Sequence, residues 1–133
     1  WKPETATING SGATGSPYAP VRYDGRTIHI AQCNNVFIFP AIGLGVVAAE
    51  ARRVTDGMIL AAAKALGDHS PARTDPSGAL LPALRDVRAV TRAVATAVGL
   101  EAQRAGVARK TSPEELRDRV AATQWTPEYP PAV

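Results

Sequence analysis

The sequence predicts an α/β fold that is mostly helical, with one or two short strands and a short hairpin near the N-terminus. Three observations lead to this expectation: a turn dipeptide at Asp24-Gly25 between two strand-like runs, an unbroken apolar stretch at 36–49, and a long amphipathic run at about 86–105. The chain has 133 residues, and since domains usually hold roughly 100–200 residues, we expect one domain. We describe it as a single incomplete domain, 1–133, with parts at 1–35, 36–110 and 111–133.

The first part is expected to hold loops and the hairpin. Residues 1–20 are rich in Gly, Pro, Ser and Thr, which favour turns over regular structure, so we expect them to be mostly loop. Between 21 and 30, two short runs of strand-forming residues flank Asp24 and Gly25. This dipeptide tolerates the positive φ angles of a two-residue hairpin turn, so the region is predicted to be a hairpin.

The middle of the chain is predicted to be helical. Residues 36–49 carry no charge and are apolar on every side, which predicts a segment that is buried all round. A helix is predicted over 58–66, because Thr55 and Asp56 supply oxygens that can cap its N-terminus. Gly67 is expected to end this helix in the left-handed conformation.

Two further helices follow a polar, proline-containing loop. Asp86 is predicted to cap the long amphipathic helix, and Gly106 is predicted to end it. Ser112 is followed by Pro, Glu and Glu, which predicts a capping box with proline at the first helical position. The residues from 125 to 133 are rich in proline and are expected to be non-helical.

Charge and cysteine content exclude several classes of protein. The net charge is +3, but the arginines alternate with acids and lack aromatic neighbours, which is typical of solvated helix faces and disfavours a nucleic-acid partner. The single cysteine, Cys33, cannot form an intramolecular disulfide and favours a reducing compartment. No run approaches the ~20 apolar residues that cross a bilayer. We therefore expect a cytoplasmic protein with no membrane partner.

A glycine motif at 43–48 has two interpretations. Its Gly-x-Gly-x-x-Ala pattern follows an apolar run that could be a strand, as in a loop that binds a dinucleotide pyrophosphate. However, Pro40 lengthens the connection, and no acid follows at the end of a second strand. The favoured interpretation is a buried helix whose glycines, Gly43 and Gly45, permit close packing against another element.

The chain offers no complete metal site and no catalytic group. A structural zinc site needs four Cys or His ligands, and the chain holds only three such residues: His29, Cys33 and His69. Cys33 could act as a nucleophile with His29 as its base, but a buried or pocket-lining thiol is the favoured interpretation. The acids fall at helix starts or in a turn, so no paired-carboxylate metal site is expected.

The remaining candidates could line a pocket. Gly15 and Ser16 offer bare backbone and a hydroxyl at the end of an extended piece, which suits close approach by a flat ligand. Asn34 and Asn35 offer two amides, which can donate to a carboxylate and accept from a carboxamide. An Asn-Asn pair is more often a turn or a helix cap, and that alternative stays open.

Taken together, the motifs resemble the C-terminal part of malic enzymes, in order and in spacing. They are Ala-Thr-Gly-Ser-Pro-Tyr-Ala-Pro-Val at 13–21, Gln-Cys-Asn-Asn-Val-Phe-Ile-Phe-Pro at 32–40, Gly-Leu-Gly at 43–45, Arg-Val-Thr-Asp at 53–56, Gly-Ala-Leu-Leu-Pro at 78–82 and Trp-Thr-Pro-Glu-Tyr at 125–129. The version with Cys33 resembles the NAD-dependent, bacterial large-subunit type. Residues before Ala13 follow the pattern poorly, and Ala41 stands where many relatives have Gly.

The resemblance implies a partial Rossmann-like NAD-binding domain followed by C-terminal helices. It implies that Gly15, Ser16 and Asn34 lie at the cofactor, NAD or NADP, and that Asn34 and Asn35 contact malate. The family oxidises and decarboxylates malate to pyruvate with a divalent metal, Mg or Mn. We expect its metal ligands and its catalytic Tyr and Lys to lie upstream of Trp1, so that this chain contains none of them.

Two functions follow from the resemblance. The chain is expected to be the cofactor- and malate-binding portion of an oxidative decarboxylase, inactive alone, with the N-terminal part of the enzyme and further copies of itself as partners. The alternative is a non-catalytic binding or assembly module derived from such an enzyme.

Overall fold

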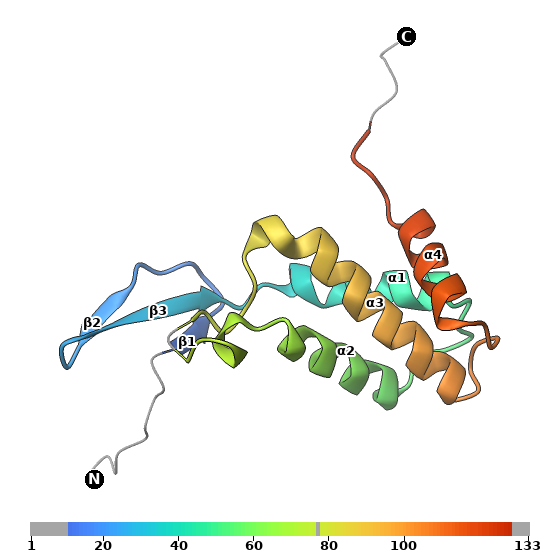
Figure 1. The fold of residues 1–133 in the computed structure, drawn as a ribbon, viewed down its shortest axis with the longest axis horizontal. Helices are drawn as coiled ribbons and strands as arrows, with labels where there is room; N and C mark the ends of the chain where they lie inside the picture. Colours follow the sequence, from blue (N-terminus) through green and yellow to red (C-terminus); the bar gives the residue numbers. More distant parts are fainter. Residues whose placement is uncertain (1–10, 77, 129–133) are drawn as a thin grey trace.

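A computed structural model describes residues 11–76 and 78–128 of the chain (Figure 1). A small sheet lies at one end and a group of helices at the other, joined by the segment that runs from β3 into α1. The fold is α/β and mostly helical, as predicted.

The sheet has three strands, β1 (Ser11–Thr14), β2 (Val21–Tyr23) and β3 (Arg26–Gln32), in the order β1-β3-β2. β2 and β3 form the predicted hairpin, and both turn residues have positive φ, 48° at Asp24 and 71° at Gly25. β1 pairs with β3 in parallel, so the expectation of loop is wrong at Ser11–Thr14. The rest of that expectation, over 1–10, lies outside the described residues.

The helical part contains four α-helices and three short 3-10 helices within the described residues. These are η1 (Asn35–Phe37), α1 (Phe39–Ala48), α2 (Asp56–Asp68), η2 (Pro71–Arg73), η3 (Leu84–Asp86), α3 (Val87–Arg104) and α4 (Pro113–Thr123).

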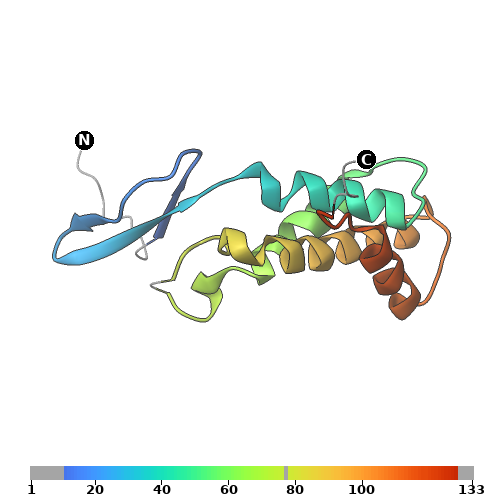
Figure 2. The same cartoon turned by 90° about the horizontal axis from the view of Figure 1, so that it is seen from above.

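α3 is the central helix, with α1, α2 and α4 packed around it (Figure 2). The core is built from small and medium side chains, and its largest fully buried members are Phe37, Met58, Leu116, Val94, Val98 and Val120. Close approach is required between α1 and α3, because a Cβ at Gly45 would lie 2.6 Å from the carbonyl oxygen of Ala95. The close approach of α1 to α3 therefore requires glycine at position 45.

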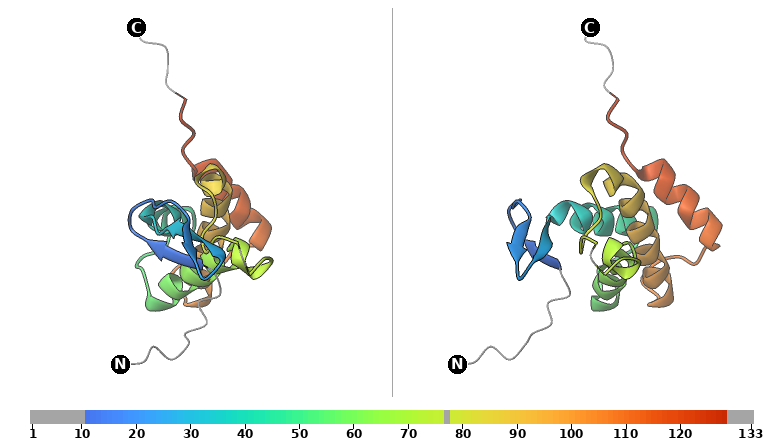
Figure 3. Two further views of the ribbon diagram at one scale, coloured as in Figure 1. Left: turned by 90° about the vertical axis from the view of Figure 1, so that its left-hand side faces the viewer. Right: turned by 60° about the vertical axis from the view of Figure 1, so that its left-hand side comes forward.

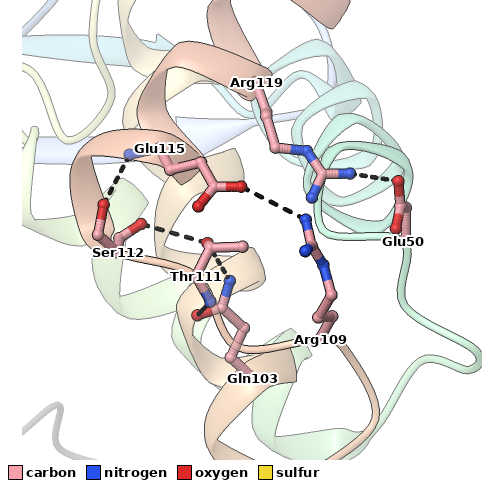
Figure 4. A network of polar contacts seen from close by, with 7 residues as sticks. All are labelled: Glu50, Gln103, Arg109, Thr111, Ser112, Glu115 and Arg119. Atoms are coloured by element: carbon pink, nitrogen blue, oxygen red, sulfur yellow. Dashed lines mark hydrogen bonds and ion pairs between the residues drawn. The ribbon is translucent and has the colours of Figure 1, made fainter.

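Polar contacts hold α4 beside the ends of α1 and α3 (Figure 4). Arg119 of α4 pairs with Glu50, which follows α1, and Arg109 pairs with Glu115 at 3.4 Å. Gln103 donates a hydrogen bond from Nε2 to the hydroxyl of Thr111 at 2.9 Å. The apolar packing of α4 comes from Leu116 and Val120, which are fully buried.

Several predicted helix ends are confirmed. Oγ1 of Thr55 accepts a hydrogen bond from the backbone amide of Met58, and Oγ of Ser112 accepts one from that of Glu115. Gly106 follows α3 in the left-handed conformation, with φ at 70°.

Other expectations about the helices are wrong. Gly67 lies inside α2 and lacks positive φ, because the helix continues to Asp68. The side chain of Asp86 makes no cap hydrogen bond, since the 3-10 turn η3 precedes α3 and places Asp86 within helical backbone. The apolar stretch at 36–49 is not buried all round, because Phe39 is 65% and Val47 is 62% exposed.

The sheet stands clear of the helices, and its strands contact one another far more than they contact any helix (Figure 3). Among the described residues, no helix combines the length and the apolar character that crossing a bilayer requires.

Candidate functional site

The C-terminal ends of β1 and β3 lie side by side. Thr14 and Gln32 are register partners in the parallel pair, and the backbone amide of Cys33 donates a hydrogen bond to the carbonyl oxygen of Thr14 at 2.7 Å. Gly15, which follows β1, and Asn34, the second residue after β3, therefore emerge at the same edge of the sheet. In parallel sheets this edge is where ligands usually bind.

Gly15 lies in open space at this edge. A Cβ built on Gly15 would meet no atom within 4 Å, so its backbone is accessible to a ligand. The turn around it is fixed by the hydroxyl of Thr14, which donates to the carbonyl oxygen of Ser16 at 2.6 Å. Ser16 itself is exposed.

Asn34 has an extended backbone and caps the short helix η1. Its Oδ1 accepts a hydrogen bond from the amide of Val36 at 3.0 Å, so the helix-cap interpretation of Asn34 is confirmed. Within the part of the chain that the structure describes, its Nδ2 has no acceptor, so the amide keeps two donors that can serve a ligand. Asn35 is exposed, and Asn34 is half-buried.

The structure thus brings together the four residues singled out from the sequence, Gly15, Ser16, Asn34 and Asn35, at one sheet edge. It adds Gln32, whose Nε2 makes a long contact of 3.5 Å with the carbonyl oxygen of Gly15. In the sequence, Gln32 stands out only as a member of the motif at 32–40. The signal that could have found it is its position two residues before Asn34, at the last position of a strand.

Gln32 also borders a hollow of about 310 Å³ between β3 and the loop that follows α2. Its walls are mostly apolar and include Phe37, Leu81 and Leu84. The candidate edge therefore combines amide donors and bare backbone with a neighbouring apolar surface, which is typical of sites for flat organic ligands.

The groups that could perform acid–base or metal chemistry do not gather at this edge. Cys33 is exposed, so the favoured interpretation of a buried or pocket-lining thiol is wrong for burial, and its pocket-lining form stays a prediction. His29 is exposed on β3. Over residues 11–76 and 78–128, no three His, Cys, Asp or Glu side chains cluster closely enough to hold a metal ion.

The glycines at 43–45 do not form a phosphate-binding turn. Both lie inside α1, so their backbone amides belong to helix interior rather than to a helix start. Gly45 permits close packing, as predicted, but a Cβ at Gly43 would meet nothing within 4 Å. The packing interpretation is confirmed for Gly45 and wrong for Gly43.

Known proteins resemble the chain in sequence and in fold. A family model described as "Malic enzyme, NAD binding domain" matches residues 5–103. The NAD-dependent malic enzymes of Pseudomonas aeruginosa PAO1 and Pseudomonas savastanoi pv. phaseolicola are 54% and 52% identical over 117 residues, which cover 88% of this chain and 21% of each relative. The crystal structure of malic enzyme from Pyrococcus horikoshii Ot3 matches with a TM-score of 0.63 and 30% identity, over 84% of this chain and 23% of that one. The chain spans about a fifth of the length of the curated relatives it matches.

Proposed function

Because this chain belongs to the malic enzyme family, where it matches the NAD-binding domain, we propose that it is the cofactor- and malate-binding portion of an enzyme that oxidatively decarboxylates malate to pyruvate. The observation that carries this proposal is the hydrogen bond from Cys33 to Thr14, which joins the ends of two parallel strands. That joint supports a single site made from Gly15, Ser16, Asn34 and Asn35.

The residues at this edge suit a nicotinamide dinucleotide. The open backbone at Gly15 allows close approach by a flat ring, and the free donors of the Asn34 amide can meet the oxygen of a carboxamide. When bound, NAD would accept a hydride from the substrate. We assign NAD rather than NADP because the curated relatives are named NAD-dependent.

Malate is assigned to the same edge. Its two carboxylates require hydrogen-bond donors, and the exposed amide of Asn35 supplies two of them beside those of Asn34. In this assignment the chain's residues bind and orient malate against the cofactor and do not move its protons.

The divalent metal does not fit the described residues, which contain no cluster of ligands for it. We therefore assign no step to a metal in this chain. We propose that the metal ligands and the groups that transfer protons belong to the rest of a polypeptide of the relatives' length, so that this chain is inactive alone. The alternative function is a non-catalytic binding or assembly module, which the turnover measurement below distinguishes from the first.

Two measurements on the chain test this proposal. The first is a titration with NAD and then with malate, followed by backbone and side-chain amide NMR signals. We expect NAD to shift the signals of Gly15, Ser16 and Asn34, and malate to shift those of Asn35. Shifts confined to other residues would contradict the site.

A matched pair of variants sharpens the titration. Asn34→Ala should weaken NAD binding, whereas Gln124→Ala, which removes an amide at the C-terminal end of α4, should leave it unchanged. The second measurement is malate-dependent NADH formation with Mn²⁺. Turnover by the chain alone would contradict the claim that its reactive groups are supplied from elsewhere, and binding without turnover in any assembly would favour the non-catalytic module.

A further inference from the structure

Two side chains, one from each strand end, hold the backbone turn at Gly15 and Ser16. Nε2 of Gln32, the last residue of β3, donates to the carbonyl oxygen of Gly15 over 3.5 Å, which is long for such a bond. Oγ1 of Thr14, the last residue of β1, donates to the carbonyl oxygen of Ser16 at 2.6 Å. Both carbonyl oxygens of the turn therefore have a partner that fixes their direction.

The planarity of the peptide bond carries this constraint to a backbone amide. Among the described residues no peptide bond is cis, so the C=O of Gly15 and the N–H of Ser16 point in opposite directions within one plane. Because the oxygen points toward the side-chain amide of Gln32, the N–H points away from it. Over residues 11–76 and 78–128, no acceptor meets this N–H. The amide of Ser16 thus has a fixed direction and an unused donor.

The neighbouring backbone cannot replace this donor. Pro17 has no backbone N–H, and the amide of Cys33 already donates to Thr14. Ser16 is exposed, so a ligand at the sheet edge can reach its N–H. A donor that is already held in one direction costs little ordering entropy when it binds an oxygen.

Gln32 also contacts the other side of the site. Its backbone carbonyl oxygen accepts a hydrogen bond from the amide of Asn34 at 3.1 Å. Its side chain is half-buried and borders the apolar hollow next to the edge. Gln32 therefore bonds to both halves of the candidate site, to Gly15 through its side chain and to Asn34 through its backbone.

We propose that the backbone N–H of Ser16 donates a hydrogen bond to the carboxamide oxygen of the nicotinamide, and that Gln32 and Thr14 are positioning residues that direct this N–H. This assignment rests on the function proposed above, because it requires NAD to bind at this edge. A carboxamide oxygen has two lone pairs, so it accepts from Ser16 and Asn34 together. Gln32 acts through Gly15 and does not touch the ligand.

The first test measures hydrogen exchange of the Ser16 amide by NMR, at saturating NAD and at saturating ADP-ribose, which lacks the nicotinamide. Bound NAD should slow this exchange by about tenfold or more, because the new hydrogen bond must open before exchange. ADP-ribose should leave the exchange fast. If NAD shifts the signals of Asn34 but leaves exchange at Ser16 fast, the inference is overturned and the proposed function stands. If NAD shifts neither Gly15 nor Asn34, both are overturned.

Two variants and a matched control test the positioning residues. Gln32→Met keeps the length of the side chain and removes its donor, and Thr14→Val removes the donor at the other carbonyl. Each should weaken NAD binding by about three- to tenfold, which corresponds to one hydrogen bond, and leave the affinity for ADP-ribose unchanged. Gln124→Met, the same substitution at the C-terminal end of α4, should alter neither affinity.

A role in stability alone gives a different pattern. If Gln32→Met and Thr14→Val weaken NAD and ADP-ribose equally, the two side chains stabilise the sheet without directing the Ser16 amide, and the proposal is overturned. Unchanged NAD affinity in both variants overturns it as well. The NMR signal of the Cys33 amide reports whether the β1–β3 joint is intact, and if Gln32→Met fails to fold, Thr14→Val decides the test by itself.

Discussion

The backbone amide of Cys33 lies 2.7 Å from the carbonyl oxygen of Thr14, and this hydrogen bond places the residue after β1 beside the residue after β3. Cys33 is exposed at this joint and directly precedes Asn34. Its thiol is therefore a natural reporter of any ligand that binds between the two strand ends.

Bound NAD should protect Cys33 from alkylation. At an NAD concentration about ten times its dissociation constant, the rate of reaction with iodoacetamide should fall roughly tenfold, because only the free fraction of the chain reacts. Intact mass gives the rate directly, since the chain has one cysteine and can take one label. An unchanged rate of alkylation under conditions where NAD binds would show that NAD does not bind at this edge of the sheet.

Two glycines of α1 should respond to alanine in opposite directions. Gly45→Ala places a Cβ 2.6 Å from the carbonyl oxygen of Ala95 and 2.8 Å from Cβ of Val98, so α1 and α3 must move apart. Overpacking of this kind costs about 1–3 kcal/mol of unfolding free energy.

Gly43→Ala is the matched control on the same helix. It meets open space, and alanine favours helix over glycine by up to about 1 kcal/mol, so this variant should be more stable than the parent chain. Urea denaturation of both variants checks the pair, and destabilisation of similar size in both would contradict the packing argument.

Local chemistry predicted much of the fold. The hairpin follows from the φ preferences of Asp24 and Gly25, and the starts of α2 and α4 follow from the hydroxyls of Thr55 and Ser112, each within three residues of its partner. β1 could not be predicted in this way, because it exists only through pairing with β3, where each register partner lies 18 residues further along the chain.

The same limit applies to burial and to the site. The sequence of α1 is apolar all round, but exposure of Phe39 and Val47 depends on which elements cover the helix, and that is not encoded within the helix itself. Their own chemistry makes Gly15 and Asn34 candidates in the sequence, but only the resemblance to a family implies that both lie at the cofactor. The resemblance does not give the register of the strands. The parallel register of β1 and β3 brings the two strand ends together and places Gln32 in contact with Gly15.

Glu50 should be replaceable by glycine with a gain in stability. It follows α1 with φ at 54°, a left-handed conformation that costs an L-residue roughly 1–2 kcal/mol. Its exposed ion pair with Arg119 contributes only about 0–1 kcal/mol to the unfolding free energy. Glu50→Gly should therefore raise the unfolding free energy by about 1 kcal/mol, measured by urea denaturation.

Arg119→Gln is the control for Glu50→Gly, because it removes the ion pair and leaves the backbone of Glu50 unchanged. It should be neutral or slightly destabilising. If Glu50→Gly and Arg119→Gln lowered the unfolding free energy by the same amount, the left-handed backbone at Glu50 would contribute no strain.

The contact between Glu101 and Arg104 should make stability depend on pH at the acidic end. Arg104 donates two hydrogen bonds to the Glu101 carboxylate, both at 2.6 Å, and these bonds lower the pKa of Glu101 below its ordinary value of 4.5. A carboxyl whose pKa is lowered by folding stabilises the folded state above its unfolded pKa and loses that contribution as the pH falls through the folded pKa.

The difference in unfolding free energy between the parent chain and Glu101→Gln should therefore be constant near neutral pH and shrink below about pH 4.5. Arg104→Gln should abolish the same pH dependence, since it removes the donor and leaves the carboxylate. Thermal melts of the three proteins from pH 7 to pH 3 measure this, and a difference that persists unchanged at pH 3 would mean that the carboxylate gains nothing from Arg104.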